Sequence, residues 1–298
     1  MGDGADYQAL REDVGAVWLE RDFVAVDGPD AVSFLQGQLS QDVNVEVGAS
    51  AWAMVLQPQG KLDAFVRLWR QGEDRFVLDT DGGWGPAVVE RLNRFKLRVK
   101  AEVGPLAWKC LALRGPRAHE VAGAAASPGT VVLGADWPGL AGADLVGEGP
   151  ELPAGVRLCG PAAYQVARIE AGVPEMGREI DESTIPAEAG IVERSVSWTK
   201  GCYTGQELVA RIDSRGGNVP RRLRGLVLGE GEVPPAGARV VAGEKDVGRV
   251  TSVGEPIEGR APVALAYVGR AVEPPADVTV TWDGGSVLAT VEPLPLVP

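Results

Sequence analysis

The stretch Lys200-Gly201-Cys202-Tyr203-Thr204-Gly205-Gln206-Glu207 is the part of the chain from which the rest can be interpreted. Thr204 and Glu207 have the S/T-x-x-E spacing of a capping box, which predicts a helix that begins at about Gly205. Apolar residues at helical spacing follow, and we expect them to face a core: Leu208, Val209 and Ile212.

Cys202 lies just ahead of this predicted helix. The unpaired N–H groups and the positive end of the helix dipole lie there, and Lys200 adds a cation. The helix end and the cation each favour the thiolate form of Cys202. The alternative is that Cys202 is a small buried hydrophobe, as most free cysteines are. Because Gly201 and Gly205 would keep the thiol accessible, we predict a reactive Cys202 with Lys200 as its catalytic partner.

The composition limits the classes of function. A chain of 298 residues exceeds one typical core and predicts two or three domains. There is no apolar run long enough to cross a membrane, and the acidic start is unlike a signal peptide, so we expect a cytoplasmic protein without a membrane partner. The net charge of -12 argues against direct nucleic-acid binding.

The sequence has few residues that could form a metal site or a catalytic triad. The three cysteines, Cys110, Cys159 and Cys202, are far apart, and His119 is the only histidine. No zinc site or Ser-His-Asp triad fits such a set, and a conventional iron–sulfur cluster needs about four cysteine ligands. We therefore predict no resident metal.

The order of predicted elements gives a domain division. The segment 49–104 looks complete in itself, with strands Trp52–Leu56, Leu62–Trp69, Arg75–Leu78 and Leu97–Val103 and a helix Trp84–Phe95. We interpret it as a second α/β domain inserted into a first one, which comprises 1–48 and 105–216 and carries the cysteine motif. Beyond it, 217–298 is expected to be all strand and to form a small barrel or sandwich.

Glu170 has an unusual position. A helix should begin at Pro161 and stop before Gly172, which leaves Glu170 in its last turn against the negative end of the dipole. The carboxylate either binds a ligand or pairs with Arg168 or Arg178, and spacing alone slightly favours the ion pair.

The motif from Lys200 to Glu207 resembles that of the YgfZ family of folate-binding proteins, which is similar throughout to the aminomethyltransferase (T-protein) of glycine cleavage. Further blocks resemble that family in the same order: Phe34–Val43, Gln57–Leu62, Leu113–Pro116, Arg168–Gly172 and Pro186–Gly190. The resemblance implies an α+β fold, a three-domain cloverleaf of two ferredoxin-like α/β domains and a C-terminal small β-barrel. It also implies tetrahydrofolate in a central cavity.

The resemblance assigns roles to residues. It implies that Glu170 contacts the pterin, where a carboxylate can accept two N–H bonds, and that Asp63 and Gln206 are further folate contacts. It implies a role in maintaining iron–sulfur enzymes, including those that modify tRNA, through Cys202. The expected partners are folate and iron–sulfur enzymes or assembly factors.

One departure separates the two branches of this resemblance. The strands Trp52–Leu56 and Leu62–Trp69 should form a hairpin with its turn at Gln57–Lys61. T-protein has paired Asp residues after this Gly-rich hairpin turn, whereas this chain has Lys61-Leu62-Asp63-Ala64, and T-protein lacks the cysteine octapeptide. We therefore predict a tetrahydrofolate-binding protein that supports iron–sulfur cluster assembly or repair. The alternative is a folate-dependent aminomethyl or methyl transferase that uses Asp63. The thiolate of Cys202 suits a nucleophile, a one-carbon acceptor or a transient iron ligand, and the sequence favours none of these.

Overall fold

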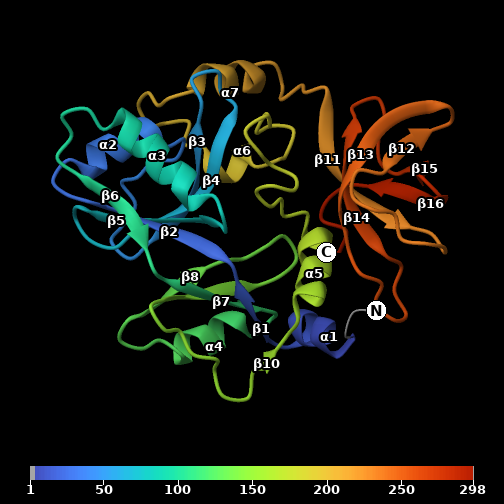
Figure 1. Cartoon of the computed structure of the whole chain (residues 1–298), viewed down its shortest axis with the longest axis horizontal. Coiled ribbons are helices and arrows are strands. Elements are labelled where there is room, and N and C mark those ends of the chain that lie inside the picture. The colour runs from blue at the N-terminus through green and yellow to red at the C-terminus, as the bar shows by residue number, and fades with distance from the viewer. Residues whose placement is uncertain (1–3, 298) are drawn as a thin grey trace. The chain divides into compact units, whose positions relative to one another are not determined.

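The computed structural model describes residues 4–297, whose helices and strands are labelled in Figure 1. The chain groups into two compact units. The first unit comprises residues up to Leu19, Cys110–Pro174 and residues from Val219 on. The second unit comprises Glu20–Lys109 and Glu175–Asn218.

The second unit is built on a five-stranded antiparallel sheet in the order β3-β4-β5-β2-β6. Its strands are β2 (Arg21–Asp27), β3 (Ser50–Leu56), β4 (Leu62–Arg70), β5 (Arg75–Asp81) and β6 (Glu102–Leu106). The predicted hairpin between β3 and β4 is confirmed, and the Gln57 N–H donates to the Lys61 carbonyl at 2.9 Å across the turn.

Two helices, α2 (Ala31–Gln38) and α3 (Gly85–Phe95), supply apolar side chains to one face of this sheet. Successive strand residues point to opposite faces, and alternate β4 residues such as Ala64, Val66 and Leu68 enter that core. The predicted helix is confirmed within one residue. The strand predicted from Leu97 is wrong at its start, because Arg98 turns the chain with φ +61° and β6 begins at Glu102.

Strand β2 belongs to the sheet of the second unit, which differs from the predicted division. It pairs along its length with β5 and also with β6, so residues 49–104 do not contain their whole sheet. The second unit also includes the later helices α6 (Val192–Ser195) and α7 (Gln206–Asp213), which we had expected in the first domain. Local patterns did not indicate these pairings, since β2 and β5 lie about fifty residues apart.

The first unit contains a second five-stranded sheet, in the order β10-β1-β7-β9-β8. Its strands are β1 (Gly15–Leu19), β7 (Lys109–Arg114), β8 (Thr130–Gly134), β9 (Gly142–Gly147) and β10 (Arg157–Leu158). Helix α4 (Ala118–Ala124) contributes Ala118 and Ala122 to the core on this sheet. The unit also contains α1 (Gly4–Glu12) and α5 (Pro161–Ala171).

Helix α5 has the ends that the sequence predicts. Pro161 is its first residue, and Gly172 ends it in the left-handed conformation with φ +69°. Asp6 of α1 accepts a hydrogen bond from the Gly160 N–H at 2.7 Å and another from Arg157, and Asp6 is buried. This carboxylate therefore satisfies the N–H group of the residue that precedes α5 and attaches α1 to that point of the chain.

We expect Asp6→Ala to lower the free energy of unfolding by about 1–3 kcal/mol, because the Gly160 N–H and Arg157 lose a buried acceptor. Asp13→Ala is the control, because Asp13 pairs with Arg117 at the surface and should matter by less than about 0.5 kcal/mol. Urea denaturation followed by circular dichroism measures both. Equal stability of the two variants would contradict this role of Asp6 as a buried acceptor.

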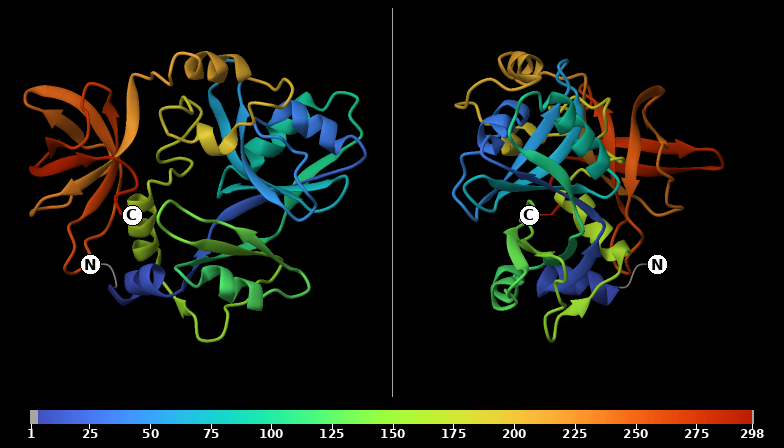
Figure 2. Two further views of the ribbon diagram at one scale, coloured as in Figure 1. Left: turned by 180° about the vertical axis from the view of Figure 1, so that it is seen from behind. Right: turned by 60° about the vertical axis from the view of Figure 1, so that its left-hand side comes forward.

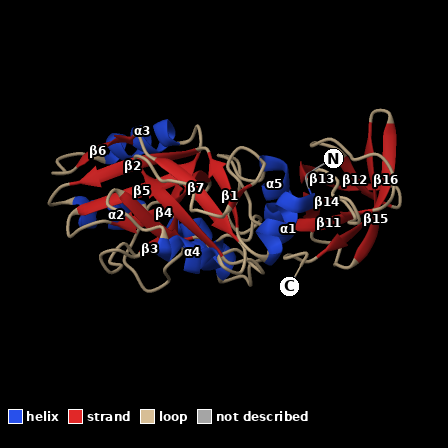
Figure 3. Ribbon diagram, turned by 90° about the horizontal axis from the view of Figure 1, so that it is seen from below, coloured by secondary structure: helices blue, strands red, loops and turns tan. Residues whose placement is uncertain are grey.

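The C-terminal part of the first unit is a closed six-stranded barrel in the order β11-β14-β13-β12-β15-β16. Its strands are β11 (Arg221–Leu228), β12 (Arg239–Ala242), β13 (Lys245–Val253), β14 (Val263–Gly269), β15 (Ala276–Trp282) and β16 (Gly285–Glu292). Figures 2 and 3 show it as strands and loops only. The all-strand character expected for 217–298 is confirmed, and the strands form a barrel and not a sandwich.

The α/β composition of the rest is also confirmed, and the three-domain cloverleaf stays a prediction. In residues 4–297 we find no helix with the length and apolar character to cross a membrane.

Candidate functional site

Cys202 is exposed, whereas Cys110 and Cys159 are buried. It lies in an irregular loop that precedes α7 in the second unit. The interpretation of Cys202 as a buried hydrophobe is therefore wrong, and its reactivity stays a prediction.

Lys200 attaches this loop to the end of α2. Its ammonium donates to the carbonyls of Gln36 at 2.8 Å, Leu39 at 2.7 Å and Gln41 at 2.9 Å. The last carbonyls of a helix lack partners within the helix, and a cation at that end also complements the dipole. Burial lowers the pKa of Lys200 to about 8. All three donors of the ammonium are thus engaged with backbone, which gives Lys200 a positioning role beside its predicted catalytic one.

Backbone hydrogen bonds hold the loop on both sides of Cys202. The Thr204 N–H donates to the Gly37 carbonyl at 3.1 Å, and the Ser197 N–H donates to the Ser40 carbonyl at 3.1 Å. The buried Ser40 hydroxyl donates in turn to the Ser195 carbonyl at 2.6 Å. The exposed thiol therefore projects from a loop whose two ends are fixed to the same segment.

Two glycines allow the start of α7 to touch the β3–β4 hairpin. Gly205 has φ +81°, and a Cβ there would lie 2.5 Å from the Gln57 carbonyl oxygen. Gly60 has φ +78°, and its Cβ would lie 2.5 Å from the Leu208 Cβ. Both positions therefore require glycine, for the backbone conformation and for the close approach.

The capping box predicted between Thr204 and Glu207 is wrong. Gly205 caps α7, and no side chain caps the helix. Instead, the Gln206 Oε1 accepts from the Tyr203 N–H at 3.1 Å, so this predicted folate contact also holds the turn after Cys202. Of the apolar residues of α7, Val209 is buried while Leu208 and Ile212 are half-buried.

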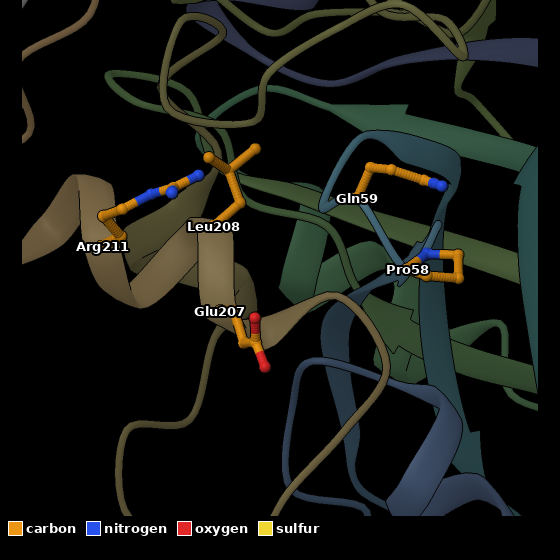
Figure 4. A pocket seen from close by; sticks show the side chains of 5 residues that line it. All are labelled: Pro58, Gln59, Glu207, Leu208 and Arg211. Carbon is orange, nitrogen blue, oxygen red and sulfur yellow. The ribbon is translucent and has the colours of Figure 1, made fainter.

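A pocket of about 340 Å³ lies where the hairpin meets α7. It is lined by Pro58, Gln59, Glu207, Leu208 and Arg211. Figure 4 shows Pro58 and Gln59 on the hairpin and the other three side chains projecting from the helix. The contact that fixes the cysteine loop thus leaves a hollow beside it.

Asp63 is connected to the same helix end as Lys200. Its carboxylate accepts from Arg91 Nε at 3.0 Å, and Arg91 also donates to the Gln38 Oε1 at 3.0 Å and to the Leu56 carbonyl at 3.1 Å. Burial lowers the pKa of Arg91, and the side chain of Asp63 remains 25% exposed. The second unit thus contains four of the five predicted site residues: Asp63, Lys200, Cys202 and Gln206.

The fifth, Glu170, lies in the first unit and is 1% exposed. The Tyr7 hydroxyl lies 2.8 and 2.7 Å from its two oxygens, and Arg260 donates at 2.9 Å. Burial and the neighbouring carboxylate raise the pKa of Tyr7, so its hydroxyl stays protonated and donates. Glu170 is therefore ion-paired, but with Arg260 and, at 3.9 Å, with Arg11, instead of the Arg168 or Arg178 considered from spacing.

The second face of the sheet in the second unit carries charged and aromatic residues that sequence reasoning missed. Arg67 pairs with Asp79 at 2.5 Å, and Arg21 reaches Asp79 at 2.9 Å and Asp81 at 2.7 Å. The sequence pattern that could have indicated this face is in β4, where Asp63, Phe65, Arg67 and Trp69 alternate with small or aliphatic residues. That pattern predicts two different faces.

The comparisons with known proteins agree with this geometry. The GCVT N-terminal domain matches residues 3–131, and the glycine cleavage T-protein C-terminal barrel domain matches 221–298. An aminomethyltransferase of Thermus thermophilus is 30% identical over 310 residues, which cover 92% of this chain and 84% of the relative. The chain belongs to the glycine cleavage T-protein family.

Two further proteins are similar to this member of the T-protein family. The human mitochondrial iron-sulfur cluster assembly factor IBA57 is 32% identical over 235 residues, which cover 68% of this chain and 64% of that protein. The crystal structure of aminomethyltransferase T from Bartonella henselae superposes with a TM-score of 0.84 at 24% identity and covers 99% of this chain and 89% of that one. The superposition shows that the T-protein fold extends over the whole chain.

The side chains at the motif of this T-protein family member supply oxygen, nitrogen and sulfur groups that can contact a ligand. Among residues 4–297, no group of three or more His, Cys, Asp or Glu side chains could hold a metal ion. The chemistry available at the motif is therefore that of one exposed thiol and the polar groups that fix its loop.

Proposed function

We propose that this member of the T-protein family binds tetrahydrofolate and supports iron–sulfur cluster assembly or repair through Cys202, and so supports iron–sulfur enzymes that modify tRNA. The observation that carries the proposal is the exposed thiol on a loop fastened by Lys200 and Gly205. The similarity to a human protein named as an iron–sulfur cluster assembly factor supports the same assignment.

The thiol acts on an iron–sulfur species as substrate in this proposal. One thiolate supplies one of the roughly four ligands that a conventional cluster needs, so the other ligands come from a client enzyme or assembly factor. Lys200 and the backbone hydrogen bonds of the loop hold Cys202 in place for that partner. Lys200 holds this loop on the end of α2, and its catalytic role beside Cys202 is part of the proposal.

The chemistry of Glu170 fits a pterin. Its oxygens accept from the Tyr7 hydroxyl and from Arg260, and the amino and ring N–H groups of a pterin are donors of the same kind. Arg260 is 43% exposed, so its guanidinium can turn into water and free an acceptor site. We assign the pterin contact to Glu170. The proposed further contacts are the exposed part of Asp63 and the amide N–H₂ of Gln206.

We expect Glu170→Gln to weaken tetrahydrofolate binding about 10- to 100-fold, because hydrogen bonds to a charged group become hydrogen bonds to a neutral one. Titration of the purified protein under anaerobic conditions measures the dissociation constant. Glu12→Gln is the matched control, since Glu12 is exposed on α1 and accepts a hydrogen bond from the Gln8 amide at 2.8 Å. Arg260→Ala removes the donor that the pterin would replace on Glu170, so this variant should still bind tetrahydrofolate.

Two results would contradict the assignment. Wild-type protein that does not bind tetrahydrofolate would remove the ligand, and Glu170→Gln protein that is folded and binds like wild type would remove the residue. Thermal unfolding of each variant separates loss of binding from loss of structure.

A second candidate function is an aminomethyl transferase, which the 30% identity to the Thermus aminomethyltransferase favours. Asp63 would be its polar catalytic group, held in place by Arg91. Incubation with tetrahydrofolate and an aminomethylated lipoyl carrier distinguishes the two functions. The iron–sulfur proposal predicts no methylenetetrahydrofolate, whereas product that is lost in Asp63→Asn would establish the transferase.

A further inference from the structure

Arg194 of α6 is half-buried, and its Nε is buried without a hydrogen-bond partner among residues 4–297. A guanidinium carries five N–H donors, and a buried donor that lacks an acceptor is costly. Burial lowers the pKa of Arg194 to about 10, so the group still carries its charge at neutral pH.

Two stacked aromatic rings lie beside this guanidinium. The Trp52 and Phe65 rings are 4.9 Å apart and nearly parallel at 8°. The Arg194 guanidinium carbon lies 5.6 Å from the Trp52 centroid and 5.1 Å from the Phe65 centroid. Cation–π attraction holds the arginine there, but aromatic rings accept none of its in-plane N–H groups.

The carboxylate that acts on Arg194 through space already accepts hydrogen bonds from other groups. Asp81 favours the charged form of Arg194 through space. However, its Oδ1 accepts from Arg21 at 2.7 Å, and its Oδ2 accepts from the Met176 N–H at 2.9 Å. Asp81 therefore balances part of the charge and leaves the Nε–H of Arg194 without an acceptor.

The other arginine on these rings behaves differently. Arg67 also lies 5.6 Å from the Trp52 centroid, and it pairs directly with Asp79. The face that carries these residues thus combines one neutralised arginine with one that has donors to offer. Trp52 itself is half-buried.

We propose that Arg194 binds an ionised carboxylate of the ligand, and that this carboxylate belongs to the glutamate tail of folate. The inference rests on the proposed function and adds a specific contact to it. The planar fork of a guanidinium matches a carboxylate in a bidentate arrangement. The p-aminobenzoyl ring next to the glutamate is a flat aromatic group that suits contact with the aromatic rings beside Arg194.

The test compares ligands with and without the tail. Tetrahydrofolate, a tetrahydropterin that lacks the p-aminobenzoyl-glutamate, and p-aminobenzoyl-glutamate alone are titrated against wild type, Arg194→Gln and Arg194→Lys. We expect Arg194→Gln to weaken tetrahydrofolate binding about 10- to 100-fold and to leave the tetrahydropterin unchanged, with Arg194→Lys in between. Arg249→Gln is the control, because Arg249 is 59% exposed and pairs with Asp246 at the surface.

The results separate this inference from the function on which it rests. Arg194→Gln protein that binds tetrahydrofolate like wild type, while Glu170→Gln does not, would overturn the Arg194 contact alone. Equal losses for the two ligands with and without the tail would also overturn it, since they indicate a structural effect. Wild type that binds neither folate nor pterin would overturn the proposed function together with the contact.

Discussion

Gly205→Ala is expected to lower the free energy of unfolding by about 2–5 kcal/mol. A left-handed conformation costs a residue with a Cβ about 1–2 kcal/mol, and overpacking adds about 1–3 kcal/mol. The added atom would lie 2.5 Å from the Gln57 carbonyl oxygen and 2.7 Å from the Leu56 Cβ, and neither belongs to the end of a flexible side chain. The hairpin and α7 would have to move apart.

Gly201→Ala is the matched control for this prediction. Gly201 is next to Cys202, has no positive φ, and a Cβ there would meet nothing within 4 Å. We expect its effect on the free energy of unfolding to stay within about 0.5 kcal/mol. Urea denaturation monitored by tryptophan fluorescence compares the two variants. Similar stability of Gly201→Ala and Gly205→Ala would contradict the close packing of the loop on the hairpin.

The second large effect concerns thiol chemistry. In the native protein, iodoacetamide should label Cys202 at least about 10³-fold faster than Cys110 or Cys159. Buried groups react only when the structure opens, and opening of a core costs a substantial part of the 5–15 kcal/mol of a typical domain. Both slow cysteines are buried, and Cys110 lies in β7 at 0% exposure.

Peptide mapping by mass spectrometry measures this labelling, with and without urea. Cys202→Ser should lose nearly all native labelling and keep the labelling in urea. Rapid native modification of Cys159 would contradict the arrangement of the three thiols that the structure describes.

Local patterns predicted those elements whose ends and faces are marked by nearby residues. The barrel strands alternate and end at turns, and α5 is bounded by Pro161 and Gly172. The membership of β2 was not predictable in this way, because its pairing with β5 and β6 depends on residues far along the chain. The same applies to Thr204, whose N–H bonds to Gly37 instead of supporting a capping box.

In the candidate site, too, the features that depend on nearby residues were predictable and those that depend on distant residues were not. Exposure of Cys202 was predicted from the flanking glycines, yet Gly205 is required for its contact with the hairpin and Gly201 is not. Glu170 was singled out by its position in the helix, but its partner Arg260 lies 90 residues away. The unsatisfied Arg194 became visible only once its neighbours were known, since nothing in its own segment distinguishes it.

The central claim is that Cys202 carries the function in iron–sulfur metabolism, and complementation tests it most directly. Aconitase activity is measured in cells that lack this protein and express wild type, Cys202→Ser or Cys159→Ala at equal levels. Cys159→Ala keeps the exposed thiol and removes a buried one, so it controls for the loss of a cysteine. We predict that wild type and Cys159→Ala restore aconitase activity and that Cys202→Ser does not. Full restoration by Cys202→Ser would contradict the account.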